Sequence, residues 1–344
     1  SLASSPVFFE RNRGYNTLQF YTCDISSLNQ GTDFVGGLQD NGTLLFQNGE
    51  LDINDMISGG DGAYCFFDKD EPIVVTSTYY NAWYAIDLED NSYDYDQSNS
   101  GVFINPADYD SDSNTIYANK VRFNGSQSNR IIKVTGIPSD LSSSTISLNT
   151  NTPVYFSAIE ISPFSVNSTT LFIGTQSGRL YRVENVDSNP STYEIGSSLF
   201  PTANISSIDV GASEDELLVT FSNYGVQSVW FTSDGGQTWI EKESNLPDMP
   251  VRWGLVHHEN SDFALLATEI GVWKTSNLQD DSPVWVPSVN GFANVRVDML
   301  SMRESDNMVL AASHGRGLFY GQFDTYSDQL GDLNSDQSIN ILDA

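Results

Sequence analysis

Two apolar runs flank a polar turn in the stretch Asp33-Phe34-Val35-Gly36-Gly37-Leu38-Gln39-Asp40-Asn41-Gly42-Thr43-Leu44-Leu45-Phe46. Short apolar runs on either side of turn residues predict a β-hairpin, and glycine supplies the positive φ that tight turns require. The pattern recurs at 170–181, 217–225, 263–273 and 308–320, and less regularly at 73–84 and 115–134. Seven units about 43–53 residues apart predict an all-β fold, a single seven-bladed β-propeller.

The two ends of the repeat suggest how the ring closes. The last unit, 295–323, supplies only three strands, and Pro6-Val7-Phe8-Phe9-Glu10 precedes the first unit without a partner. We therefore expect the N-terminal strand to complete the last blade, because closure removes an open sheet edge. The predicted domains are a propeller over 1–325 and, over 326–344, a linker with the start of a calcium-binding module.

The composition excludes several classes of function. The chain has 344 residues, with 15 Lys+Arg against 45 Asp+Glu and a formal net charge of −30. Nucleic-acid binding through a basic surface and docking on an anionic membrane are both disfavoured, and no apolar run reaches the roughly 18–20 residues of a membrane span. No glycine-rich phosphate loop opens a helix, so no organic cofactor is expected. The acidic, lysine-poor composition favours a secreted protein.

The heptapeptide Ser233-Asp234-Gly235-Gly236-Gln237-Thr238-Trp239 predicts a structural turn. The aspartate can accept backbone N–H groups, Gly236 permits a left-handed φ, and the tryptophan can pack between blades. The motif resembles the Asp-box of sialidases, tandem-propeller xyloglucanases and sortilin-type receptors. The resemblance implies a structural role for Ser233, Asp234, Gly236, Thr238 and Trp239 on the outer hairpin of a blade. Thr275-Ser276-Asn277 with Trp285 forms a degenerate copy.

A wider resemblance covers most of 15–323. The segments Gly36–Thr43, Gly59-Gly60-Asp61-Gly62 and His314-Gly315-Arg316-Gly317 are similar to motifs of secreted, sialidase-like repeat propellers of Bacteroidetes-type bacteria. This resemblance implies export, by a route such as type IX secretion, to the extracellular space or the outer cell surface of a bacterium. The resemblance implies the fold and the cellular location of the protein more than it implies an activity.

Two segments have the spacing of calcium ligands. The C-terminal segment 332–343 spaces oxygen-bearing side chains as an EF-hand-type loop does, and it resembles the first half of a dockerin repeat. Its predicted ligands are Asp332, Asn334, Asp336, Ser338, Asn340 and Asp343. Gln337 stands where such a loop usually has glycine. The resemblance also implies that the segment is a spacer before a C-terminal sorting or anchoring domain. A weaker candidate consists of Asp108, Asp110, Asp112 and Asn114, for which a solvated acidic turn is the alternative.

Propeller geometry predicts where a ligand would bind. Loops from the second to the third strand of each blade, and connections between blades, should meet around one mouth of the central channel. The candidate ligand-binding residues are Asp40, Asn41, Asp61, Gln176, Asn223, Tyr224, Arg252, Trp253, Glu269, Arg296, His314 and Arg316. Acids, arginines and aromatics around a concave mouth suit a glycan or a partner protein. The alternative is that Asp40, Asp61 and Arg316 only hold turns or pair with one another.

Three functions remain open. The favoured one is non-catalytic binding of a glycan or an extracellular protein. The second is a glycoside hydrolase using paired carboxylates, with Asp40 and Asp61 as catalytic candidates from adjacent blades. Sialidase chemistry is disfavoured because the chain has ten arginines and no Arg-Ile-Pro sequence. The third is a structural protomer of a surface assembly.

The two cysteines, Cys23 and Cys65, occupy similar places in the predicted innermost strands of neighbouring blades. One disulfide and two buried thiols are the alternatives.

Overall fold

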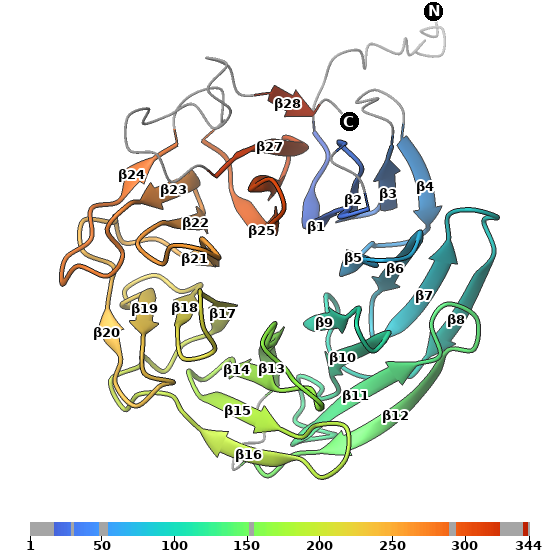
Figure 1. Ribbon diagram of the computed structural model, residues 1–344, viewed down its shortest axis with the longest axis horizontal. Helices are drawn as coiled ribbons and strands as arrows, with labels where there is room; N and C mark the ends of the chain where they lie inside the picture. The colour runs from blue at the N-terminus through green and yellow to red at the C-terminus, as the bar shows by residue number, and fades with distance from the viewer. Residues whose placement is uncertain are drawn as a thin grey trace, which may run out of the picture.

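Seven antiparallel sheets of four strands each surround a central axis in the computed structural model, which describes residues 17–28, 31–47, 54–150, 155–288, 294–323 and 340–342 (Figure 1). The all-β, seven-bladed prediction is confirmed. Within these ranges, no helix is long and apolar enough to cross a membrane.

Each blade runs outward from the axis in chain order. The inner strands are β1 (Phe20–Ile25), β5 (Cys65–Phe67), β9 (Ala107–Asp110), β13 (Phe156–Ile161), β17 (Ile205–Val210), β21 (Val251–Val256) and β25 (Val297–Arg303). The second strands are β2 (Phe34–Leu38), β6 (Ile73–Thr78), β10 (Thr115–Asn119), β14 (Leu171–Thr175), β18 (Leu217–Phe221), β22 (Ala264–Thr268) and β26 (Met308–Ser313). All seven second strands fall inside the predicted repeat units.

The outer half of each blade consists of its third and fourth strands. The third strands are β3 (Gly42–Phe46), β7 (Ala82–Asp87), β11 (Arg130–Thr135), β15 (Leu180–Glu184), β19 (Val229–Thr232), β23 (Gly271–Thr275) and β27 (Leu318–Gln322). The outer strands are β4 (Asn54–Ser58), β8 (Tyr93–Gln97), β12 (Ser142–Ser147), β16 (Ser191–Glu194), β20 (Ile240–Glu241), β24 (Val286–Pro287) and β28 (Asn340–Leu342). The second strands are buried along their whole length, whereas β8 and β12 are largely exposed.

The core lies between blades. Seven clusters of buried apolar side chains each join two neighbouring blades, so that every interface of the ring has its own core. Burial of both faces explains why the second strands are near-continuous apolar runs.

The ring closes between the first and last blades. The Arg303 guanidinium, which is 1% exposed, donates to the carbonyl oxygens of Ser26 and Gly31, each at 2.9 Å, and pairs with Asp306. The fourth strand of the seventh blade is β28, which pairs with β27. The stretch 6–10, predicted for that position, lies outside the described residues, as does 324–339.

Close backbone contact explains the glycines of the first blade. A Cβ at Gly37 would clash with the carbonyl oxygen of Ala63, and one at Gly62 would clash with the carbonyl oxygen of Gly42. The Gly62 N–H donates to the Leu38 carbonyl oxygen at 2.9 Å. The two glycine-rich motifs therefore fit against each other where the chain passes from the first blade to the second.

The loop 233–239 joins β19 to β20 on the outer hairpin of the fifth blade, where the sequence predicts a structural turn. The Asp234 carboxylate accepts hydrogen bonds from the Thr232 hydroxyl and from the N–H and hydroxyl of Thr238, at 2.8, 2.8 and 2.6 Å. These bonds lower the pKa of Asp234, the hydroxyl of Thr238 contributing most. Gly235 and Gly236 have φ values of 69° and 86°. The carboxylate thus holds the turn together.

The degenerate copy in the sixth blade has the same arrangement. The Asn277 side-chain oxygen accepts from the Thr275 hydroxyl at 2.8 Å and from the Val284 N–H at 2.9 Å. An amide oxygen therefore replaces the carboxylate at the centre of the turn.

Both cysteines are free and buried in the structure. The Cys23 thiol lies 3.6 Å from the Leu310 carbonyl oxygen, and the Cys65 sulfur lies 3.4 Å from the Thr22 hydroxyl. Each sulfur atom is therefore in contact with a polar group of a different blade.

Candidate functional site

The loops between second and third strands lie beside the residues that precede the inner strands. Backbone N–H groups of Gln39, Gln176, Ser222 and His314 donate to carbonyl oxygens just before the inner strand of the same blade. These loops and the connections between blades therefore share one end of the propeller, as the sequence predicts.

Asp298, on β25, is the centre of a polar network at this end. One carboxylate oxygen accepts from Arg296 Nε at 2.8 Å and lies 2.7 Å from Arg296 Nη2. The other lies 3.2 Å from His314 Nδ1. The Asp298 side chain is 10% exposed. The predicted residues Arg296 and His314 are thus brought together by a carboxylate that the sequence interpretation missed.

Arg252 extends the network into the sixth blade. Its Nε, at 2.8 Å, and its Nη2 both donate to the same carboxylate oxygen of Glu269, Oε1, and its Nε lies 3.7 Å from Asp298. Three cationic or protonatable side chains therefore surround Asp298. Charge pairing fixes the positions of the two arginines, so their remaining N–H groups have defined directions.

Tyr21, on β1, completes the network from the first blade. Its ring centroid lies 5.9 Å from that of His314. Burial, followed by the carboxylates of Asp61, Asp40 and Asp298, raises the pKa of Tyr21. The hydroxyl therefore stays protonated at neutral pH and can both donate and accept hydrogen bonds.

A sequence signal for Tyr21 and Asp298 does exist. Each is the second residue of an inner strand and follows a fully buried apolar residue, as Arg252 does. In each of these strands the pairing register shifts at this residue, as in a β-bulge, and a bulge leaves the extra residue outside the ladder and redirects its side chain.

Asp40 and Asp61, the predicted carboxylate pair, do lie together. Asp61 Oδ1 accepts a hydrogen bond from the Asp40 backbone N–H at 2.9 Å, and Asp40 has a left-handed φ of 60°. Asp61 therefore holds the turn between β2 and β3, as the structural alternative requires.

The other predicted residues are more dispersed. Asn41 donates to the Gln39 carbonyl oxygen within its own turn, at 2.9 Å, and Trp253 packs against the apolar clusters beside the seventh blade. Gln176, Asn223 and Tyr224 belong to the fourth and fifth blades, across the ring from β1 (Figure 1). The Arg316 side chain is exposed.

Inner strands also carry acids that join neighbouring blades. A carboxylate oxygen of Asp24 accepts from the Phe67 N–H of the next blade at 2.8 Å. Asp108 accepts from Ile161 at 2.7 Å and Asp209 from Val256 at 2.6 Å in the same way. Three blade junctions therefore share one type of contact, which the sequence interpretation did not predict.

These inner-strand acids have raised pKa values. Burial raises the pKa of Asp24 to about 6, and the pKa values of Asp108 and Asp209 to about 7. Burial and then the nearby charges of Asp108 and Asp209 raise the pKa of Glu160 well above its usual range. These inner-strand acids therefore bind protons at a higher pH than ordinary carboxyl groups do.

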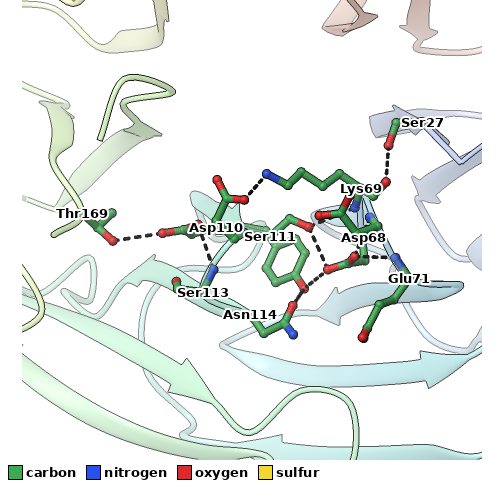
Figure 2. A network of polar contacts seen from close by, with 12 residues as sticks. Ser27, Asp68, Lys69, Glu71, Asp110, Ser111, Ser113, Asn114 and Thr169 are labelled. Atoms are coloured by element: carbon green, nitrogen blue, oxygen red, sulfur yellow. Dashed lines mark hydrogen bonds and ion pairs between the residues drawn. The ribbon is translucent and has the colours of Figure 1, made fainter. Parts of the chain in front are cut away.

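The segment 108–114 comprises the end of β9 and the turn to β10, and its carboxylates contact different partners (Figure 2). Asp110 accepts from the Thr169 hydroxyl of the next blade at 2.9 Å. Asp112 pairs with Lys69 of the preceding blade, whereas Asp108 binds the Ile161 N–H. Within the described residues, no group of three His, Cys, Asp or Glu side chains is placed to hold a metal ion.

Asp68 is the centre of the same polar region (Figure 2). Its carboxylate accepts hydrogen bonds from the hydroxyls of Tyr109 and Ser111, at 2.7 and 2.8 Å, and from the backbone N–H groups of Asp70 and Glu71. The region joins the second, third and fourth blades. Its contacts serve to hold the blades together.

The C-terminal calcium loop stays a prediction. Asp332, Asn334, Asp336, Ser338 and Asp343 lie outside the described residues. Asn340 is described only as the first residue of β28.

Comparison with known proteins adds no assignment, since no family model and no curated protein matches the chain. This end of the propeller carries arginines paired with carboxylates, one imidazole and one phenol. These groups offer hydrogen-bond donors and acceptors to a ligand that has many hydroxyl groups.

Proposed function

We propose that this chain is a secreted or cell-surface propeller that binds a glycan without catalysing a reaction. The observation that supports this most is the Arg296–Asp298–His314 network beside Tyr21. Arg296 is held in place by Asp298, so little conformational entropy is lost when its remaining N–H groups bind hydroxyl groups. The Arg296 and His314 side chains are 35% and 22% exposed, so a ligand can reach them from solvent.

The hydrolase alternative has less support. A glycosidase needs two carboxyl groups on opposite sides of the bond, one as acid and one as base or nucleophile. Asp61 is engaged by the backbone N–H of its neighbour Asp40. A carboxylate that holds a turn in this way is poorly suited to exchange protons with a substrate.

A glycan array and a reducing-sugar assay test the proposal. We expect the native protein to bind short glycans, Arg296→Ala to weaken this binding at least tenfold, and no reducing sugar to be released. Tyr193→Ala, at an exposed position on β16 of the fourth blade, should retain binding. Glycan-dependent sugar release that Asp61→Asn abolishes would establish the hydrolase instead. Absence of binding to any glycan would contradict the proposal.

Calcium binding by 332–343 is a further part of the proposal, based on the spacing of the ligands. Titration of the full chain with calcium, compared with an Asp332→Ala/Asp336→Ala variant, tests it. Heat of binding in the native protein alone would support the site, and equal traces would contradict it.

A further inference from the structure

Exposed aromatic side chains gather on the second blade. Sixteen large apolar side chains are exposed among the described residues, and five of them fall between positions 79 and 103. All five are aromatic: Tyr79, Tyr80, Tyr93, Tyr95 and Phe103, with exposures of 40, 43, 69, 40 and 38%. Single exposed apolar residues are ordinary, but a contiguous group indicates a binding surface.

The rings form two groups of three, named here together the aromatic strip and made of these five residues with Tyr84. The rings of Tyr79 and Phe103 are parallel within 6°, with centroids 5.9 Å apart, and Tyr80 lies edge-on to both. The Tyr84 ring lies 4.7 Å from that of Tyr95 and 6.4 Å from that of Tyr93.

Tyr79, in the first group, lies within electrostatic range of the second group. Burial, followed by the hydroxyls of Tyr93 and Tyr79, raises the pKa of Tyr84, and Tyr79 also contributes to the raised pKa of Tyr95. The Tyr79 ring also lies next to Gly60, where a Cβ would meet it at 3.7 Å. Gly60 precedes Asp61, so the strip begins beside the channel mouth.

Strand register explains the outer half of the strip. Tyr84 on β7 pairs directly with Tyr95 on β8, and Ile86 pairs with Tyr93. Side chains at paired positions lie on the same face, and alternate residues of a strand share that face. The three tyrosines therefore cover one face of the second blade.

A buried amide network fixes the inner half. Asn81 Nδ2 donates to the Asn119 carbonyl oxygen at 2.9 Å, and Asn105 Nδ2 donates to Asn81 Oδ1 at 2.8 Å. Asn81, Asn105 and Asn119 are at most 2% exposed. The network ties the turn that carries Tyr79 and Tyr80 to the loop that carries Phe103.

Tyr80 is also held in an unfavourable backbone conformation. Its φ is 60°, which is uncommon for a bulky residue and costs free energy. Rings that are exposed to water yet held on a rigid base are prepared for a ligand.

The chemistry around the strip narrows the class of ligand. Five of its six rings are tyrosines, which combine an apolar face with a hydroxyl group. Nucleobases also stack on such rings, but Asp94 and Asp96 alternate with Tyr93 and Tyr95 along β8, and the net charge is −30. These charges repel phosphate, sulfate and uronate groups, and they disfavour a second copy of the chain.

We propose that the aromatic strip binds an extended, uncharged polysaccharide whose sugar rings stack on successive aromatic faces. The inference rests on the proposed function for its ligand class, but it names different residues and a longer ligand. A chain that lies along the strip would reach Asp61 and the mouth. Short glycans would occupy the mouth, whereas polymers would also use the strip.

Affinity electrophoresis in gels that contain hydroxyethyl cellulose, galactomannan or laminarin tests the inference, with alginate and chondroitin sulfate as anionic comparisons. We expect at least one neutral polymer to retard the native protein and neither anionic polymer to do so. Tyr79→Ala/Phe103→Ala should weaken the retardation about tenfold or more, because stacking on one ring contributes roughly that factor. Tyr79→Phe should bind as the native protein does.

Tyr193→Ala is the matched control, since Tyr193 is 52% exposed and lies on β16 of the fourth blade. It should leave polymer binding unchanged. Thermal unfolding of each variant checks that the second blade stays folded, as the truncated side chains are exposed.

Three results would overturn the inference. The double variant could bind polymer as tightly as the native protein, an anionic polymer could bind the strip equally well, or no neutral polymer could bind. If Arg296→Ala loses polymer binding and the strip variant keeps it, the mouth proposal stands and the strip inference fails. If only the strip variant loses polymer binding and Arg296→Ala keeps its binding to short glycans, the strip inference stands and the mouth proposal fails.

Discussion

The indole Nε1–H of Trp239, in the fifth blade, donates a hydrogen bond to the carbonyl oxygen of Ile195 in the fourth, at 2.8 Å. The next junction repeats this relationship, where Trp285 Nε1 donates to the Lys242 carbonyl oxygen at 2.8 Å. In both cases a tryptophan after an outer-hairpin turn fills the junction with the preceding blade. The turn and the blade junction are therefore stabilised by the same short segment.

Replacing Trp285 should destabilise the propeller strongly. The side chain is 1% exposed, so Trp285→Ala creates a cavity and leaves a buried carbonyl group without its donor. We expect a loss of about 3–5 kcal/mol in the free energy of unfolding for this variant, and about 1–3 kcal/mol for Trp285→Phe. Urea denaturation followed by fluorescence measures both. Equal stability of Trp285→Phe and the native protein would show that the hydrogen bond contributes nothing.

Arg303 should be essential for ring closure. Arg303→Met removes donors from two carbonyl oxygens of the first blade and leaves Asp306 without its buried partner. We expect a loss of about 3–5 kcal/mol, as is typical when one member of a buried ion pair is removed. Arg316→Met, at an exposed position, should change stability by less than about 0.5 kcal/mol. Similar midpoints for the two variants in denaturant would contradict this view of closure.

Stability should rise as the pH falls from about 8 to about 5. The folded-state pKa values of Asp24, Asp108 and Asp209 lie above the usual value of 3.8, so in this window the folded state binds more protons than the unfolded state. The free energy of unfolding then decreases as pH increases, by a total of the order of a few kcal/mol. Melting temperatures measured between pH 5 and 8 give the slope.

Reduction of net negative charge alone would also favour the folded state at lower pH. Asp209→Asn separates the two causes, because the amide oxygen can still accept from the Val256 N–H but cannot titrate. The variant should show a shallower slope. A slope identical to that of the native protein would assign the effect to net charge.

The two thiols should be unreactive in the folded protein. Burial raises the pKa of Cys65 to about 12 and raises the pKa of Cys23 well above its usual value, and only the thiolate attacks alkylating reagents. We expect no labelling by iodoacetamide at pH 8 until denaturant is added, and then two labels in mass spectrometry. A dithiothreitol-dependent fall in melting temperature would instead reveal a disulfide.

Local patterns of the sequence determined the architecture. A blade is a series of adjacent strands, so its apolar runs, glycine turns and polar loops repeat along the chain at a readable interval. The same locality made the turn around Asp234 predictable, since its hydrogen bonds join residues at most four positions apart. The expectation that the chain does not bind nucleic acid rests on net charge, which needs no knowledge of where each residue lies.

Tertiary structure decided the contacts within the ring. Ser301 donates to Asp24 across 277 positions of sequence, and His314 lies beside Tyr21 only because the seventh blade returns to the first. The centre of the mouth at Asp298 and the alignment of Tyr79 with Phe103 likewise depend on how loops from different strands converge. Sequence spacing contains no information on such convergence, because the closed ring, rather than the chain, brings these side chains together.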